Sequence, residues 1–104
     1  MKFFLAAPLS LAALVALPAA AAAADAQKGE ALAKRWCAFC HVVAEGQRAG
    51  NPDVPSFAAI GSRPNYDAQA VANFLMSPHP VMPNMSLSRA EAADLAAYIA
   101  SQKN

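Results

Sequence analysis

The 104-residue sequence contains few of the residues that staple small proteins or bind metal ions. It has only two cysteines, two histidines and four glycines. Two cysteines cannot form a framework of several disulfides. A structural zinc site needs four ligands, and the only cysteines and histidines available are Cys37, Cys40, His41 and His79. Because Cys40 and His41 are adjacent, they point poorly at one metal ion, so the sequence disfavours zinc.

Charge is also scarce, and it is balanced. Charged residues make up 14% of the chain. Beyond residue 24 there are seven Lys and Arg residues, because Lys2 is the only one of the eight that comes earlier, and all seven Asp and Glu residues. This balance provides no basic patch for nucleic acid and no block of one sign for a highly charged partner. The sequence also shows no Ser/His/Asp set and no paired carboxylates, so we do not expect an enzyme.

Much of the apolar content lies at the N-terminus. Lys2 gives a positively charged start, and residues 3–17 form an apolar stretch interrupted by Pro8. Ala22-Ala23-Ala24 then forms a small-residue site of the kind that is cleaved on export. These features predict that residues 1–24 are a cleaved signal peptide. The alternative is an uncleaved membrane anchor, but the apolar stretch is short for a spanning helix.

Cleavage before Asp25 would export the remainder, residues 25–104, as a single domain, and we expect a bacterial periplasm as its location. The mature chain would then have no stable membrane insertion. An oxidising compartment also means that its two cysteines need not be reduced thiols. About eighty residues bury only a thin core, so a chain of this length benefits from a cofactor in its interior.

The pattern after residue 24 is helical. Asp25 is a good N-cap for a first helix whose apolar side carries Ala31, Leu32, Ala33 and Trp36. Residues 55–60 are compatible with a short helical turn. Turn-rich segments at 45–47 and 49–52 separate these two elements, which indicates a long connecting loop.

Two further helices are predicted in the second half. Asp67 caps one of them, which has Ala70, Val71, Phe74 and Leu75 at helical spacing and stops at Ser77-Pro78. Ser88 and Glu91 form a capping box for a final helix. That helix carries Leu95, Tyr98 and Ile99 on one face and extends to about Lys103. The fold class is therefore all-α, with three main helices and long loops that would wrap around a cofactor.

Residues 37–41 spell C-x-x-C-H, the signature of covalent haem attachment. Two thiols add to the two vinyl groups of one porphyrin, so Cys37 and Cys40 must lie about one helical turn apart. The imidazole of His41 then ligates the iron from one side. The motif predicts one covalently attached haem c per chain.

The same cysteine pair has other uses. A thioredoxin-type thiol–disulfide site would need a βαβ context, and no convincing strands surround residues 37–40. A disulfide across four residues would be a strained, weak staple. Haem remains the better interpretation of the motif.

An electron-transfer haem requires a second axial ligand, and the proline-rich loop before the last helix offers His79, Met82 and Met85. Met82 is our choice, because a thioether favours reduced iron and Pro80 and Pro83 stiffen the loop around it. Met85 is the fallback. His79 would instead give two histidine ligands and a lower potential.

These motifs together resemble those of class I cytochromes c of the small bacterial kind, over the whole of residues 25–104. Gly29 is similar to the small residue at the family's crossing of its first and last helices, and Leu95 and Tyr98 to the face that meets it. Met82-Pro83-Asn84 is similar to the family's M-P-x-N loop. The resemblance implies the class I cytochrome c fold around one covalent haem.

The resemblance also implies roles for residues outside the attachment motif. The Pro55 carbonyl would accept a hydrogen bond from Nδ1 of His41, and Phe57 would pack against the haem. The family also implies a frame for the haem edge formed by Phe39 and Val42. Arg63, Tyr66 and Asn84 are candidates for contacts to the haem propionates, because Arg and hydroxyl donors suit carboxylates, and an ordinary surface position is the open alternative for each. Trp36 is a further candidate for packing against the haem.

The implied function is that of an exported one-electron carrier with His41/Met82 ligation. Its partners would be redox enzymes of the periplasm or inner membrane, and we expect a monomer. Three alternatives remain: an electron-transfer subunit dedicated to one periplasmic dehydrogenase, a ligand-binding or peroxidase-like haem protein with a labile methionine bond, and a thiol–disulfide oxidoreductase.

Overall fold

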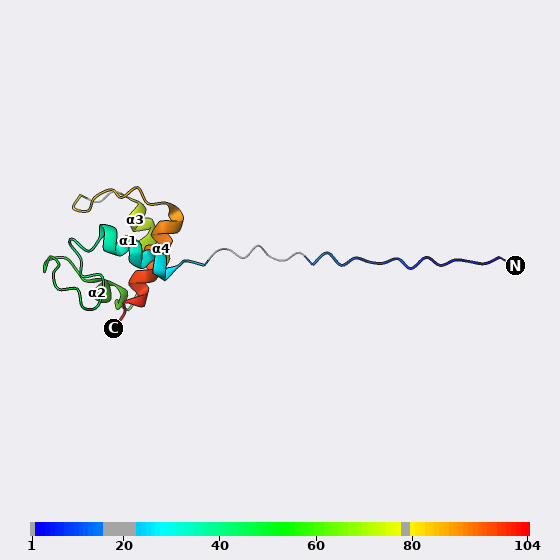
Figure 1. The fold of residues 1–104 in the computed structure, drawn as a ribbon, viewed down its shortest axis with the longest axis horizontal. Coiled ribbons are helices and arrows are strands. Elements are labelled where there is room, and N and C mark those ends of the chain that lie inside the picture. Colours follow the sequence, from blue (N-terminus) through cyan, green and yellow to red (C-terminus); the bar gives the residue numbers. More distant parts are fainter. Residues whose placement is uncertain (1, 16–22, 78–79) are drawn as a thin grey trace.

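The structure is a computed structural model that describes residues 2–15, 23–77 and 80–104. The regular structure of these residues is helical, and none of them forms a strand. Residues 2–15 have neither helix nor strand, are exposed, and extend away from the helices (Figure 1). Within the described ranges, no helix is long and apolar enough to cross a membrane. Part of the predicted signal peptide, residue 1 and residues 16–22, lies outside the described residues.

Helix α4 is the centre of the arrangement, because it packs against each of the other three helices. The N-terminal segment and the C-terminus leave the helical body in different directions (Figure 1). Three helices are long and one is a short turn, which agrees with the predicted all-α class. Their bounds are α1 Ala26–Trp36, α2 Phe57–Gly61, α3 Ala68–Met76 and α4 Arg89–Ser101.

The three predicted helix starts are confirmed. The carboxylate of Asp25 accepts hydrogen bonds from the first amides of α1, and that of Asp67 does the same for α3. At α4 the capping box is complete, with the Ser88 hydroxyl accepting from the Glu91 amide and the Glu91 carboxylate accepting from the Ser88 amide. Hydrogen bonds to the Ser88 backbone and side chain lower the pKa of Glu91. Each helix therefore starts where a polar side chain satisfies its free N–H groups.

Helices α1 and α4 approach unusually closely at Gly29. A Cβ atom at this position would lie 2.0 Å from the Asp94 carbonyl oxygen and 2.8 Å from Cβ of Tyr98. Gly61 has the same role for α2, where a Cβ would lie 2.3 Å from the Ile99 carbonyl oxygen. Neither contact leaves room for a side chain, so both crossings require glycine.

The close crossing changes which residues of α1 are buried. The buried line is Gly29, Ala33 and the following Cys37, at a spacing of four residues, while Ala31 is exposed and Trp36 is partly exposed. The apolar side predicted for this helix was therefore only partly right. Small residues occupy the interface because the two backbones are too close for large ones.

The predicted face of α3 also differs from the observed one. Ala72 is the buried residue of this helix, with Val71 and Leu75 half-buried, whereas Phe74 is 58% exposed. The helix ends at Met76, and Pro78 of the predicted stop lies outside the described residues. Helix α4 ends at Ser101, two residues before the predicted Lys103, and buries Leu95, Tyr98 and Ile99 as predicted.

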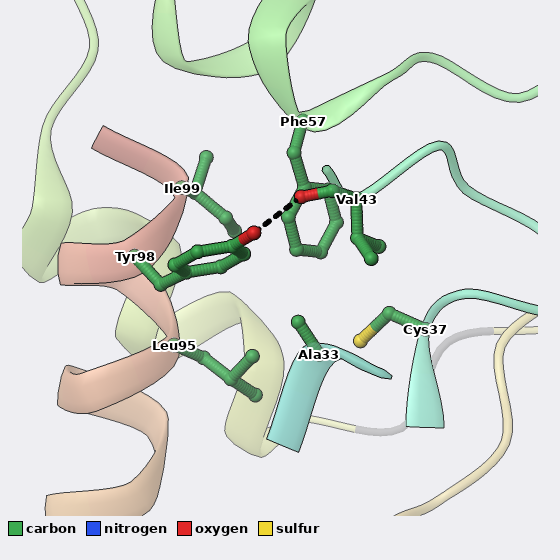
Figure 2. Close-up of a cluster of buried hydrophobic side chains, with 7 residues drawn as sticks. All are labelled: Ala33, Cys37, Val43, Phe57, Leu95, Tyr98 and Ile99. Atoms are coloured by element: carbon green, nitrogen blue, oxygen red, sulfur yellow. Dashed lines mark hydrogen bonds between the residues drawn. The ribbon is translucent and has the colours of Figure 1, made fainter. Parts of the chain in front are cut away.

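The core joins α1 and α4 to the loop that follows the first helix (Figure 2). The Tyr98 ring lies beside this loop, and its hydroxyl donates a buried hydrogen bond of 2.7 Å to the Val43 carbonyl. This bond fixes the loop after the cysteine motif to the last helix. The buried cluster consists of Ala33, Cys37, Val43, Phe57, Leu95, Tyr98 and Ile99.

We predict that Gly29→Ala destabilises the protein, although alanine normally stabilises a helix interior by about 0.5–1 kcal/mol relative to glycine. The added methyl group must displace the Asp94 backbone, and such overpacking costs about 1–3 kcal/mol. The expected result is a fall in Tm of about 4–8 °C for each kcal/mol lost in a domain of this size. Thermal unfolding followed by circular dichroism measures it.

Ala31→Gly, on the exposed face of the same helix, is the matched control because it measures the propensity difference without a packing change. A higher Tm for Gly29→Ala than for the parent protein would contradict the close crossing.

Candidate haem-attachment site

The C-x-x-C-H motif forms a tight turn at the C-terminal end of α1. Cys37 is the C-cap of the helix, and its carbonyl accepts hydrogen bonds from the amides of Cys40 (3.1 Å) and His41 (2.8 Å). Cys37 is buried and Cys40 is half-buried, and neither forms a disulfide. The turn therefore presents two free thiols and an imidazole within one short segment.

The contact predicted between His41 and Pro55 is present. Nδ1 of His41 lies 2.6 Å from the Pro55 carbonyl oxygen. Because a carbonyl only accepts, Nδ1 must carry the hydrogen, and the lone pair of the neutral ring is then on Nε2. The side chain is only 9% exposed, and no described residue forms a hydrogen bond with Nε2. A buried imidazole nitrogen with a lone pair and no polar partner is suited to a metal ion.

Phe57 packs against the imidazole of His41. Its ring centroid is 5.4 Å from that of His41, with the two planes tilted by 52°, and 6.2 Å from that of Tyr98 in an edge-on arrangement. The Phe57 amide donates to the Val42 carbonyl at 2.9 Å. The start of α2 is thus bonded directly to the residue after His41. The structure brings Cys37, His41, Pro55 and Phe57 together, and their roles in binding a haem stay predictions.

The chemistry of Cys37 differs from that of a redox-active thiol. Burial, and to a lesser extent the neighbouring Cys40, raises the pKa of the Cys37 thiol to about 11. At neutral pH it is therefore protonated. Reactive thiols in C-x-x-C redox sites have a lowered pKa, so that they act as nucleophiles in the thiolate form. This arrangement disfavours a thiol–disulfide oxidoreductase.

The structure does not connect either candidate methionine to His41. Met82 and Met85 are half-buried, and neither belongs to the buried cluster around the motif. The third candidate, His79, lies outside the described residues. After Met85 the chain passes through Ser86 with a positive φ of 50°, where the Asn84 side chain accepts a hydrogen bond from the Ser86 amide. The loop that carries Met82 thus contains a defined turn.

The residues considered for the propionates are spread over two segments, and of the three only Tyr66 packs against the buried cluster that contains Cys37. Arg63 and Tyr66 line a hollow of about 320 Å³ between α2 and α3, and Arg63 is exposed. The Tyr66 hydroxyl donates to the Ala96 carbonyl at 2.5 Å, so its hydrogen is already used within the fold. Asn84 is exposed and caps its own turn. These three residues therefore do not converge on one point at which an anion could bind.

Three aromatic and aliphatic residues near the motif have different surroundings. Phe39, between the two cysteines, is 94% exposed, and Val42 is half-buried. Trp36 is partly exposed, with the Arg35 guanidinium 5.1 Å from the centre of its ring. Phe39 therefore has the exposure expected of a residue at a contact surface, whereas Trp36 is less exposed and contacts the Arg35 side chain.

Gln47 is a residue of the site that the sequence did not reveal. Its side-chain amide forms hydrogen bonds with Val43, His41, Ala38 and Ala49. In the sequence it appeared only as part of a turn-rich segment. A glutamine in such a loop gives no signal of its own, because its partners are backbone groups that any residue would supply.

The donor set fits a covalently attached haem. The motif offers two free thiols for the vinyl groups and one imidazole lone pair for the iron, next to an apolar cluster. The described part of the chain contains no group of three or more His, Cys, Asp or Glu residues that could hold a metal ion by themselves.

Comparisons with known proteins agree with this site. The sequence model of the family described as cytochrome c oxidase, cbb3-type, subunit III matches residues 24–99. The chain is 58% identical over 81 residues to cytochrome c-552 of Bradyrhizobium diazoefficiens, and the match covers 78% of each protein. No solved structure is significantly similar to the chain. The motif geometry and both matches place this chain in the cytochrome c family, as a monohaem c-type cytochrome that carries covalently bound haem c and transfers electrons.

Proposed function

We propose that the protein is an exported one-electron carrier of the class I type, with His41 and Met82 as the axial ligands of its haem. The observation that carries this proposal is the hydrogen bond from Nδ1 of His41 to the Pro55 carbonyl. It holds the imidazole in one tautomer and makes Nε2 a better donor to a metal. The haem, when bound, supplies an iron that gains and loses one electron. The close crossing of α1 and α4 at Gly29 supports the class I arrangement.

The loop between α3 and α4 supports Met82 as the second ligand. Residues 80–88 of this loop and the loop that follows α1 both project from the helical body on the side remote from the N-terminal segment (Figure 1). Pro80 and Pro83 restrict the backbone on either side of Met82. A stiff loop keeps a thioether in place when the iron changes its charge, which keeps the geometry of the two oxidation states similar. A thioether also favours the reduced state.

The proposed partners are larger redox enzymes of the periplasm or inner membrane. The exposed Phe39 and the half-buried Val42 flank the attachment site and would frame the contact surface. The charge beyond residue 24 is balanced, so the surface lacks a strong field of one sign. Contacts between electron carriers and their partners are small and short-lived, which is compatible with a monomer that docks through an apolar edge.

We predict that Met82→Ala removes the methionine-to-iron absorption band of the oxidised protein and lowers its reduction potential. The loss of the sulfur ligand opens a coordination position, so the reduced form should bind carbon monoxide at least about tenfold more tightly, which corresponds to about 1.4 kcal/mol. Absorption spectroscopy and carbon monoxide titration measure both effects.

Two other methionines serve as controls for this substitution. Met85→Ala tests the fallback ligand in the same loop, and Met76→Ala tests a partly exposed methionine on α3. If Met85→Ala alone abolishes the band, the assignment passes from Met82 to Met85. If the parent protein already binds carbon monoxide tightly at neutral pH, a ligand-binding haem protein is favoured instead.

The second candidate function is a subunit bound permanently to one redox enzyme. The family that matches residues 24–99 is described as a subunit of an oxidase, which favours this candidate over a ligand-binding haem protein and over a thiol–disulfide oxidoreductase. Affinity purification of the tagged protein from solubilised membranes distinguishes a bound subunit from a mobile carrier. A stoichiometric complex that survives gel filtration indicates a subunit, and a free monomer that is reoxidised by membranes indicates a mobile carrier.

We also propose that export removes residues 1–24. The described residues before Asp25 are exposed and have no helix or strand, and α1 begins directly after Asp25. The backbone nitrogen of Asp25 lies 2.7 Å from Oδ1 of Asp94 on α4. Cleavage before Asp25 would turn this amide into a charged amino group facing a carboxylate. The mature N-terminus would then be held to α4 by an ion pair as well as a hydrogen bond.

We predict that the mature protein begins at Asp25 by intact mass. Asp94→Asn should then destabilise it by about 0.5–1 kcal/mol, as expected for a partly exposed ion pair. In a matched protein with one extra alanine before Asp25, the backbone nitrogen of Asp25 is an amide again. Asp94→Asn should then lower the free energy of unfolding by a smaller amount. Urea unfolding of the four proteins gives the difference, which should shrink at high salt. Equal costs in both backgrounds would contradict the ion pair.

A further inference from the structure

The side chain of Gln47 forms four hydrogen bonds with the backbone of the loop around the attachment motif. Its Oε1 accepts from the Val43 amide at 2.9 Å. The two N–H groups of its Nε2 are shared among three carbonyl oxygens, those of His41 (2.8 Å), Ala49 (2.8 Å) and Ala38 (3.1 Å), so one N–H is bifurcated. The partners also fix the orientation of the amide, because an N–H lies on one side and only carbonyls lie on the other. Gln47 thus links residues on both sides of His41.

The other carbonyls of this loop are held by different elements. The Cys40 carbonyl accepts from the Asn51 amide, the Val42 carbonyl from the Phe57 amide, and the Val43 carbonyl from the Tyr98 hydroxyl. Those of Ala38 and His41 depend on Gln47. Ala38 lies between the two cysteines, and His41 is the residue whose ring must face the iron. One side chain therefore holds the backbone at two points of the motif.

We propose that Gln47 is a positioning residue that sets the orientation of the His41 imidazole. The Pro55 carbonyl holds the ring at Nδ1, and Gln47 holds the main chain of the same residue at its carbonyl oxygen. Two fixed points, one on the ring and one on the backbone, leave the imidazole little freedom to rotate about its axis. The inference rests on the proposed ligation by His41, and it adds a residue that the motif does not contain.

Two substitutions distinguish the role of the amide oxygen of Gln47 from that of its amide nitrogen. Gln47→Ala removes all four hydrogen bonds. Gln47→Glu has nearly the same shape and keeps an acceptor for the Val43 amide, but it cannot donate to the three carbonyls. Gln69→Ala is the matched control, because Gln69 is an exposed glutamine whose amide bonds the Asn73 side chain at 3.3 Å on α3.

The experiment uses the haem-loaded proteins and two readouts. Proton exchange at the His41 Nδ1–H and the Val43 amide is followed by NMR, and the electron paramagnetic resonance spectrum of the oxidised form reports the orientation of the axial imidazole. In Gln47→Ala both protons should exchange at least about tenfold faster, and the g-values should shift. In Gln47→Glu the Val43 amide should stay protected from exchange. Exchange at His41 Nδ1–H and the g-values should both change. Gln69→Ala should match the parent protein.

The inference is overturned if either Gln47 variant loads haem and keeps the parent spectrum and the parent exchange rate at His41 Nδ1–H. It is also overturned if exchange accelerates uniformly over the whole protein, because that indicates general destabilisation and not positioning. A parent protein without a haem signal is a separate result, since it refutes the proposed function and with it this inference.

Discussion

The hydrogen bond between Nδ1 of His41 and the Pro55 carbonyl is the constraint on which the rest of the site depends. It determines the tautomer of the imidazole and therefore which nitrogen has a lone pair to offer. The two residues are fourteen positions apart, so the bond also closes the loop that follows α1. Phe57, which begins α2, then packs against the same ring and bonds to the backbone of Val42. The attachment motif is thereby held between the end of one helix and the start of another.

Helix α4 supports this loop from the opposite side. Gly29 allows α1 to cross α4 at backbone distance, and Cys37 at the end of α1 lies in the same buried cluster as Leu95 and Tyr98 of the last helix. The Tyr98 hydroxyl then bonds to Val43, two residues after His41. A helix far away in the sequence therefore helps to position His41, the proposed ligand of the iron. For a chain of this size, such cross-links compensate for a thin apolar core.

The features that the sequence predicted best are those that depend on contacts between residues close together in the chain. The caps at Asp25 and Asp67 and the capping box at Ser88 follow from side chains that bond to amides two or three residues away. The attachment motif is equally local. The contact of His41 with Pro55 is not local, and it was anticipated only from the resemblance to the family.

The residues that are buried on each helix depend on tertiary packing, and the sequence pattern predicted them only in part. The pattern of apolar residues did not indicate that small residues would form the buried line of α1, nor that Phe74 would be largely exposed on α3. The first follows from how closely α4 approaches α1 at Gly29, which periodicity does not encode. Gln47 went unnoticed because its four partners are backbone groups. The position of Met82 relative to His41 stays a prediction, because no contact of the described residues joins the two.

The central claim is that a haem is bonded covalently to Cys37 and Cys40. The most direct test is intact mass spectrometry of the exported protein under denaturing conditions, together with its absorption spectrum. The account predicts a polypeptide mass increased by one haem and a visible absorbance that remains with the unfolded chain. A colourless chain with the mass of the bare polypeptide, from cells that attach haem to other cytochromes, would contradict it.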